Sequence, residues 1–598
     1  MKKKLLFSAA LLLATSVSFA QTGAETVNVV TPGTLSELVL DLESTRIKSL
    51  TVTGDINGAD IAYLNSGNGK MSSVETLDLS KVRLVPGDEP YATVQIAKSD
   101  VGMGKTTATF YISDTYSEET YQESTGLGGL AITKLIKTND LSGAFAPARP
   151  NNAPSSPLKE VILPESLPRV GDYMFTANKN ITRVVVPDGV TEIGKSAFAS
   201  TSALVSVNIP EGVTAICDAA FSRSAIASVK LPSSVNRIGA EAFMETKLTG
   251  ELDLSNVESL GAWAFYYVKI SGTLDIGKLT VIPDNAFTSG NYDNIVFSDN
   301  LVSIGEIAFA NSKVTDVKLP SSLTEMSASS FSGTPWYNSL TGEDGIIYIN
   351  EIAVAPARDV KIVDGVLTIK EGTRSLASGS WNIYTGGKYL RDIVTGISLP
   401  STLKAIGNDV FSGFTSLGDI TLPENLETVG DRSFSGCNSM WFDNLPASVV
   451  NIGEYAFSGC SSLTQITIGE NVKHIGQYAF EKCTGISLVK IYAPDLRGSD
   501  YPQFGNAGLD RVVIGSNVTY LPADAFINVA NLRKVEFEPR DGKTPFAVGR
   551  YCFTNCEKAQ FVNFPERVDS VAESAFERCA GLPEKLVLND CLSCPEKS

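Results

Sequence analysis

Cysteine is the residue of this sequence whose spacing most suggests chemistry. Five of the nine cysteines follow a phenylalanine by three residues. A regular row of thiols could bind a metal ion, but serine or alanine occupies nearby or equivalent positions elsewhere, and free cysteine is among the most often buried residue types. We therefore expect these side chains to fill space in a core. They are Cys437, Cys460, Cys483, Cys556 and Cys579.

The other motifs that could carry chemistry are weak. Cys591 and Cys594 form a CxxC pair, without the βαβ context of a redox motif. The segment VGMGKTT at 101–107 approaches a phosphate-binding loop, but that pattern needs glycine where Ser99 stands. His474 is the single histidine, which excludes multi-histidine metal sites and disfavours histidine-based catalysis. We predict no catalytic residue, no metal-ligating residue and no cofactor, while calcium binding at isolated acidic loops stays open.

Aromatic residues are the remaining candidates for a binding site. Trp336, Tyr337, Tyr384 and Tyr389 lie in or beside two segments that interrupt a repeat described below. Exposed aromatic clusters suit stacking on glycans or contacts with proteins, so these four are the predicted binding residues. Trp381 lies among them but takes the position of a repeat phenylalanine, and we expect it in the core.

Composition and charge narrow the function classes. The 598 residues are 43% hydrophobic and 19% charged, which is enough apolar material for a large core. Lysine and arginine number 49 against 66 aspartates and glutamates, giving a formal charge of −17. A nucleic-acid-binding protein normally carries a basic surplus, so we predict no nucleic-acid partner.

The first residues have the pattern of an export signal. Lys2, Lys3 and Lys4 precede the apolar run LLFSAALLLA, and small residues lead to Ala20. This order is typical of a signal peptide over 1–20, and the run is too short to span a membrane. No other apolar stretch approaches membrane length. The sequence predicts an exported protein at the cell surface, outside the cell or in the periplasm.

Phenylalanine recurs at intervals of mostly 22–24 residues along the chain. In the unit FSGCSSLTQITIGENVKHIGQYAF, the stretch LTQITIG alternates like a strand, and proline or glycine ends the corresponding stretch in most units. One unit has only five or six large apolar side chains and cannot close a core alone. The repeat therefore predicts a solenoid of about eighteen stacked units with a parallel β-ladder. In this unit the recurring apolar residues are Phe457, Leu463, Ile466, Ile468, Val472, Ile475 and Phe480.

The pattern LPxxVxxIGxxAFxxCxxLxxVxLP resembles the BspA-like leucine-rich repeats of bacterial surface and secreted proteins, over roughly 145–578. The resemblance implies a right-handed leucine-rich-repeat solenoid of the α/β-horseshoe type, but β-rich. Its parallel β-ladder would lie on one face, and short turns or 3-10 segments on the other. The resemblance also implies adhesion to host matrix proteins, cells or glycans, without catalysis.

The rest of the chain is assigned around this repeat. Residues 21–144 are expected to form an N-terminal cap and irregular first coils, with a polar, strand-forming excursion at about 91–140. Residues 579–598 are a C-terminal cap or tail. Insertions at about 332–395 interrupt the repeat, and the runs GIIYI and IAVA within them indicate a β-hairpin. Insertions in a solenoid project from one face, either as tolerated decoration or as binding sites.

Three functions remain open. The first is a non-enzymatic surface or secreted binding protein, an adhesin for a protein or glycan on host or neighbouring cells. The second is a glycan-capturing accessory protein for nutrient uptake, which exposed aromatics near 332–395 would favour. The third is a polysaccharide-processing enzyme, which needs clustered carboxylates that the sequence does not show. We favour the first.

Overall fold

The computed structural model describes residues 23–42, 46–65, 69–98, 105–113, 115–124, 130–146, 157–541, 544–579, 581–582 and 587–588. The predicted signal peptide, Cys591 and Cys594 lie outside these residues. The chain forms two compact units, the first up to Ser322 with Ser330–Asn338, the second Leu323–Ser329 with the chain from Ser339 onward. The helices of the described residues are short, and none is long and apolar enough to cross a membrane.

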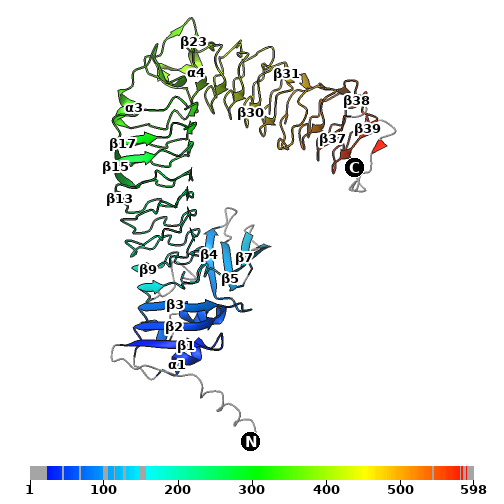
Figure 1. The fold of residues 1–598 in the computed structure, drawn as a ribbon. Coiled ribbons are helices and arrows are strands. Elements are labelled where there is room, and N and C mark those ends of the chain that lie inside the picture. The colour runs from blue at the N-terminus through cyan, green and yellow to red at the C-terminus, as the bar shows by residue number, and fades with distance from the viewer. Residues whose placement is uncertain are drawn as a thin grey trace. The chain divides into compact units, whose positions relative to one another are not determined.

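The first unit begins with coils that contain helices (Figure 1). A buried carboxylate joins two of these coils. Asp60, at 1% exposure, accepts hydrogen bonds from the backbone N–H groups of Gly33, Leu35 and Asn57. These bonds fix the start of one helix against the next, which holds the first strands in parallel register. The elements are β1 (Ala24–Val29), α1 (Leu35–Leu40), β2 (Ser49–Ile56), α2 (Gly58–Asn65), the 3-10 turn η1 (Gly69–Ser73) and β3 (Thr76–Leu84).

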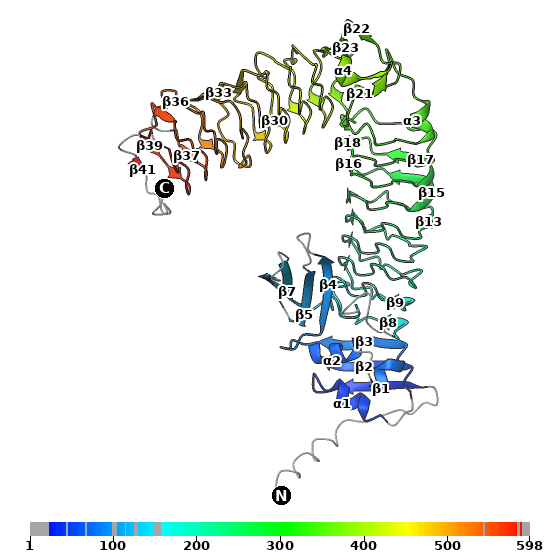
Figure 2. The same cartoon turned by 180° about the vertical axis from the view of Figure 1, so that it is seen from behind.

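The excursion predicted at about 91–140 is a four-stranded sheet beside the coils of β3, β8 (Glu160–Ile162) and β9 (Arg183–Val185) (Figures 1 and 2). Phe110 and the other inward side chains are buried, and the Tyr91 hydroxyl donates to the Ser142 carbonyl at 2.8 Å. Residues 105–107, the end of the phosphate-loop-like segment, lie in a paired strand. The sheet has the order β4 (Ala92–Lys98), β5 (Lys105–Ile112), β7 (Leu130–Thr138), β6 (Ser117–Ser124).

The repeat coils of the first unit carry two parallel ladders, one more than the sequence predicted. The expected ladder follows the LxxVxLP segment. The second follows the short segment before each IG dipeptide, because equivalent peptide groups of neighbouring coils face one another there and pair. The first ladder includes β8 (Glu160–Ile162), β9 (Arg183–Val185), β13 (Thr249–Gly250), β15 (Lys269–Ile276) and β17 (Asn291–Phe297). The second includes β10 (Glu192–Ile193), β11 (Ala215–Ile216), β12 (Arg237–Ile238), β14 (Ser259–Leu260), β16 (Val281–Ile282) and β18 (Ser303–Ile304).

A column of phenylalanine rings runs along the inside of the repeat coils. The rings of Phe198 and Phe221 are 5.1 Å apart and 6° from parallel, and the other coils repeat this contact. The Phe198 N–H donates to the Ala220 carbonyl of the next coil at 2.7 Å. In most coils the residues two before and two after the phenylalanine have positive φ, which turns the chain at this corner. We call these two residues the corner positions.

The second unit shows that the hairpin predicted near residue 350 exists but is not a projecting insertion. Its second strand pairs in parallel with the next repeat strand, so that Ile352 lies opposite Ser375. Ile346, Ile352 and Ala353 are at most 1% exposed. The expectation of a projecting insertion is therefore corrected for this hairpin, which forms the first part of a seven-stranded sheet. That sheet has the order β20 (Ile346–Ile349), β21 (Ile352–Pro356), β24 (Ser375–Leu376), β28 (Ala405–Ile406), β29 (Thr428–Val429), β30 (Asn451–Ile452), β32 (His474–Ile475).

The other ladder of the second unit follows the LxxVxLP segments. Its longest sheet has the order β31 (Gln465–Ile468), β33 (Leu488–Ile491), β34 (Arg511–Ile514), β36 (Lys534–Phe537), β38 (Gln560–Val562). Further strands are β19 (Glu325–Met326), β22 (Ile362–Val363), β23 (Val366–Thr368), β25 (Tyr384–Thr385), β26 (Lys388–Tyr389), β27 (Gly396–Ser398), β35 (Tyr520–Leu521), β37 (Ala547–Val548), β39 (Arg567–Val568), β40 (Ser570–Val571) and β41 (Val587–Leu588).

Candidate functional site

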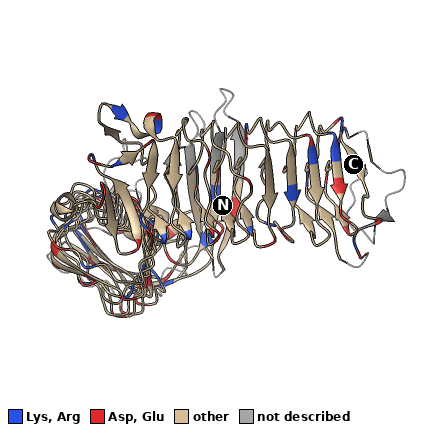
Figure 3. Cartoon of the chain, turned by 90° about the horizontal axis from the view of Figure 1, so that it is seen from above, with Lys and Arg blue, Asp and Glu red and all other residues tan. Residues whose placement is uncertain are grey.

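Several surface carboxylates pair with basic side chains, mostly from neighbouring coils. Glu75 accepts from Lys48 at 2.6 Å and from Lys159 at 2.7 Å, and these bonds lower the pKa of Glu75 to about 2. Glu536 is held in the same way by Arg511 and Lys534. Figure 3 shows acidic and basic residues interspersed along the chain. Such pairing stabilises the ionised form of a carboxylate, which is the opposite of what a general acid needs.

Four of the five regularly spaced cysteines are buried in the core, as the sequence predicted, and Cys579 is half-buried. Cys437, Cys460 and Cys483 are fully buried, and each thiol donates to the carbonyl of a phenylalanine one coil earlier. Burial raises the pKa of Cys437 and Cys483 to about 12. Across the described part of the chain, no group of three or more histidine, cysteine, aspartate or glutamate residues could hold a metal ion. His474 lies on an exposed position of β32.

The structure brings two of the four predicted binding residues together. Tyr384 and Tyr389 lie on the small hairpin of β25 (Tyr384–Thr385) and β26 (Lys388–Tyr389), where they are 59% and 42% exposed. Their ring centroids are 5.1 Å apart with the planes at 72°. The guanidinium of Arg391, in α4 (Leu390–Ile393), lies 5.0 Å from the Tyr389 centroid. The pair presents an aromatic surface beside a positive charge.

The other two predicted residues belong to the first unit and are largely packed. Trp336 and Tyr337 lie in α3 (Pro335–Ser339). The ring of Trp336 contacts Phe331 edge to face, with centroids 4.9 Å apart. Both side chains are half-buried, and burial raises the pKa of Tyr337. Trp381 is fully buried in the phenylalanine column, as predicted, although its ring is tilted by 68° against Phe411.

Sequence reasoning missed a third aromatic group, which we call the aromatic corner: Trp263, Tyr266 and Tyr267. The centroids of Trp263 and Tyr266 are 4.5 Å apart, and those of Tyr266 and Tyr267 are 4.4 Å apart. Trp263 and Tyr267 are 37% and 51% exposed. The motif WAFYYV around Phe265 contains these three aromatic residues. The sequence alone does not identify them as a surface group, because that requires knowing that the corner positions can face outward.

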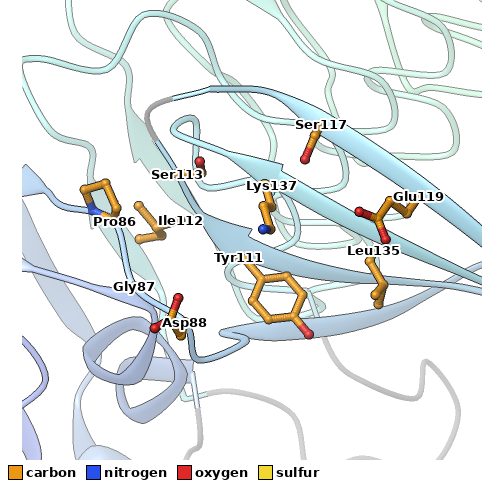
Figure 4. Close-up of a pocket in the computed structure, with 10 residues that line it drawn as sticks. All are labelled: Pro86, Gly87, Asp88, Tyr111, Ile112, Ser113, Ser117, Glu119, Leu135 and Lys137. Atoms are coloured by element: carbon orange, nitrogen blue, oxygen red, sulfur yellow. The ribbon is translucent and has the colours of Figure 1, made fainter.

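An open cavity of about 340 Å³ lies on the outer side of the four-stranded sheet (Figure 4). The segment Pro86–Asp88 forms one wall, and Tyr111, Glu119 and Lys137 from three strands form another. A phenol, an ammonium and carboxylates around one opening can hydrogen-bond a polar group of a partner.

Comparisons with solved structures find bacterial leucine-rich repeat proteins at low identity. A leucine-rich repeat protein from Bacteroides ovatus is 18% identical, with 69% of this chain and 98% of that chain covered and a TM-score of 0.24. A leucine-rich cell surface protein from Faecalibacterium prausnitzii is 18% identical, with coverages of 76% and 96% and a TM-score of 0.21. The pneumococcal vaccine antigen PcpA is 16% identical, with coverages of 81% and 97% and a TM-score of 0.21. A comparison with curated proteins finds no significant match.

The family model described as the BspA type leucine-rich repeat region matches six copies. The matched residues are 153–271, 280–373, 389–501 and 500–593, which together are more than half of the chain. They coincide with the coils that carry the two ladders and the phenylalanine column. The chain therefore belongs to the BspA-type leucine-rich repeat family.

Proposed function

We propose that this protein is a non-enzymatic, exported surface protein that binds a protein or glycan on host or neighbouring cells. The observation that carries the proposal is the regular corner of the repeat coils. Its backbone is held by hydrogen bonds from coil to coil, while the outward side chains differ between coils. A rigid row of variable side chains gains affinity from many weak contacts along its length.

Glycan capture for nutrient uptake is the second candidate. The exposed pair Tyr384 and Tyr389 beside Arg391 supports it, because tyrosine rings stack on sugar faces and the guanidinium donates hydrogen bonds. An enzyme acting on polysaccharides receives less support. Glu75 and Glu536, two of the surface carboxylates, are engaged in ion pairs between coils.

The test is to probe residues 21–598 against an array of matrix proteins and an array of glycans. Binding to matrix proteins supports the adhesin, and binding to glycans alone supports glycan capture. Absence of binding on both arrays would overturn the proposal. The variant Tyr384→Ala/Tyr389→Ala tests the hairpin, and Tyr501→Ala, another exposed tyrosine of the second unit, is the matched control. We expect about tenfold weaker binding in the double variant only.

A further inference from the structure

The aromatic corner consists of two exposed rings supported by a third. Tyr266 lies between Trp263 and Tyr267, in contact with both, at interplanar angles of 58° and 71°. Its neighbour Phe265 is buried in the phenylalanine column, 5.2 Å from Phe243. The outer rings are therefore anchored to the core of one coil, and their exposed surfaces form a fixed platform.

The backbone of this platform is held in a conformation that large side chains rarely adopt. Trp263 has φ of 64° and Tyr267 has φ of 57°, both in the left-handed region. Their N–H groups donate to the carbonyls of Asp284 and Thr288 in the next coil, which fixes both positions. Asparagine, aspartate and glycine tolerate this region better, and they occupy corner positions in other coils. Tyrosine also occupies corner positions in several other coils, and Trp263 and Tyr267 both keep more than a third of their surface exposed.

Polar groups border the rings on the preceding coil. Glu241 and Glu245 are exposed and take the corner positions corresponding to Trp263 and Tyr267. The Arg223 guanidinium donates to Glu245 at 3.0 Å. The Glu245 N–H donates to the Tyr266 carbonyl at 2.9 Å, which places Glu245 beside the aromatic corner. Partial burial, the adjacent Tyr267 and the Glu245 carboxylate raise the pKa of Tyr266.

The ring geometry restricts the type of ligand. An aromatic cage for a cation needs space between its rings, whereas the neighbouring rings here contact each other at 4.4–4.5 Å. A ligand must lie over the outer ring surfaces. A sugar ring fits this arrangement, because its weakly positive C–H face is attracted to the electron-rich face of an aromatic ring. Its hydroxyl groups can then donate to Glu241 and Glu245. Because Arg223 compensates the charge of Glu245, it is the Glu241 carboxylate that would repel an acidic sugar.

We propose that Trp263 and Tyr267, supported by Tyr266, form a binding site for a neutral saccharide of a glycan. The proposal rests on the proposed binding function and adds to it a defined site with a ligand class. The site recognises the C–H face of one sugar ring by stacking and its hydroxyls through Glu241 and Glu245. It discriminates against uronate-containing and sialylated glycans by charge.

The experiment uses residues 21–598 and an array of neutral hexose oligosaccharides beside sialylated and uronate-containing ones. The best neutral oligosaccharide is then titrated by calorimetry and by tryptophan fluorescence, with Trp263→Asn and Tyr267→Asn as variants. Trp441→Ala is the matched control, because Trp441 is exposed to a similar degree elsewhere. We expect about tenfold weaker binding in both corner variants and unchanged binding in the control.

A second readout separates binding from folding. Asparagine adopts positive φ more readily than tryptophan, so Trp263→Asn should keep or raise the melting temperature while it weakens binding. A lowered melting temperature with unchanged sugar binding would overturn the proposal. So would the absence of neutral-sugar binding, or a corner that binds a lysine-rich peptide or acidic glycans instead. Matrix-protein binding that persists in Trp263→Asn would leave the proposed adhesin function intact.

Discussion

The thiol of Cys460 lies 3.2 Å from the carbonyl oxygen of Phe434, one coil earlier in the stack. Cys437 and Cys483 make the same contact to Phe411 and Phe457. Each thiol thus donates a hydrogen bond to a buried phenylalanine carbonyl, and its sulfur fills the space beside the phenylalanine column. This contact is consistent with the recurrence of cysteine three residues after phenylalanine, since it gives the buried thiols of Cys437, Cys460 and Cys483 a structural role.

The buried thiols predict a loss of stability at high pH. The pKa of Cys437 and Cys483 is raised from 9.0 to about 12 by burial. The folded state therefore keeps these protons in a range where the unfolded state releases them. The resulting stability is complete below pH 9 and is lost as pH rises from 9 towards 12. Urea unfolding at pH 8 and pH 10.5 should show the decrease.

Replacement of one thiol provides the control for this prediction. Cys437→Ala should make the decrease between the two pH values smaller, because one raised pKa is removed. In native protein at pH 8, Cys437 should also react much more slowly with iodoacetamide than in urea. Equal alkylation rates in native and unfolded protein would contradict the buried position.

The phenylalanine column predicts a large effect of a single truncation. Phe457 is fully buried between Phe434 and Phe480, with ring centroids 5.6 and 5.4 Å away. Phe457→Ala should lower the free energy of unfolding by about 3–5 kcal/mol, because it removes the ring contacts and leaves a cavity. Urea denaturation of the second unit measures this. Thr464→Ala, at an exposed position of the same coil, should change it by less than about 0.5 kcal/mol.

The parallel pairing of the β20–β21 hairpin with the next coil predicts that its second strand, β21, is needed for stability. Ile352 is 1% exposed, and Ala353 accepts a hydrogen bond from the Ala377 N–H at 2.9 Å. Ile352→Ala should cost about 2–4 kcal/mol and speed hydrogen exchange at Ala377. Lys388→Ala, on the exposed hairpin, should leave both unchanged. Normal exchange at Ala377 in the Ile352 variant would show that the hairpin is a dispensable insertion.

Much of the fold could be read from side-chain spacing. The recurrence of phenylalanine placed Trp381 in the ring column, because one position in each coil must face inward. The cysteines also recur at one position of the coil that faces inward, and their spacing therefore indicated filling of space rather than metal binding. The second ladder was not predictable from strand composition, since its strands are only two residues long and depend on pairing between coils.

The candidate sites were harder to predict than the core. Trp336 and Tyr384 both lie near interruptions of the repeat, yet one packs on Phe331 and the other is exposed. Composition does not distinguish these outcomes, because exposure of an aromatic ring depends on what the neighbouring coil places beside it. The aromatic corner was overlooked because Trp263 and Tyr267 flank a core phenylalanine.

The sequence by itself determined the repeat, the family, the inward columns and the absence of histidine clusters, because these properties follow from residue type and period. The tertiary structure alone decided which outward residues lie side by side. Glu245 and Tyr267 are 22 residues apart in the chain but occupy equivalent corners of adjacent coils. Because the coils stack, two residues that are 22 positions apart lie on neighbouring coils. A binding surface made of such residues exists only in the stacked structure.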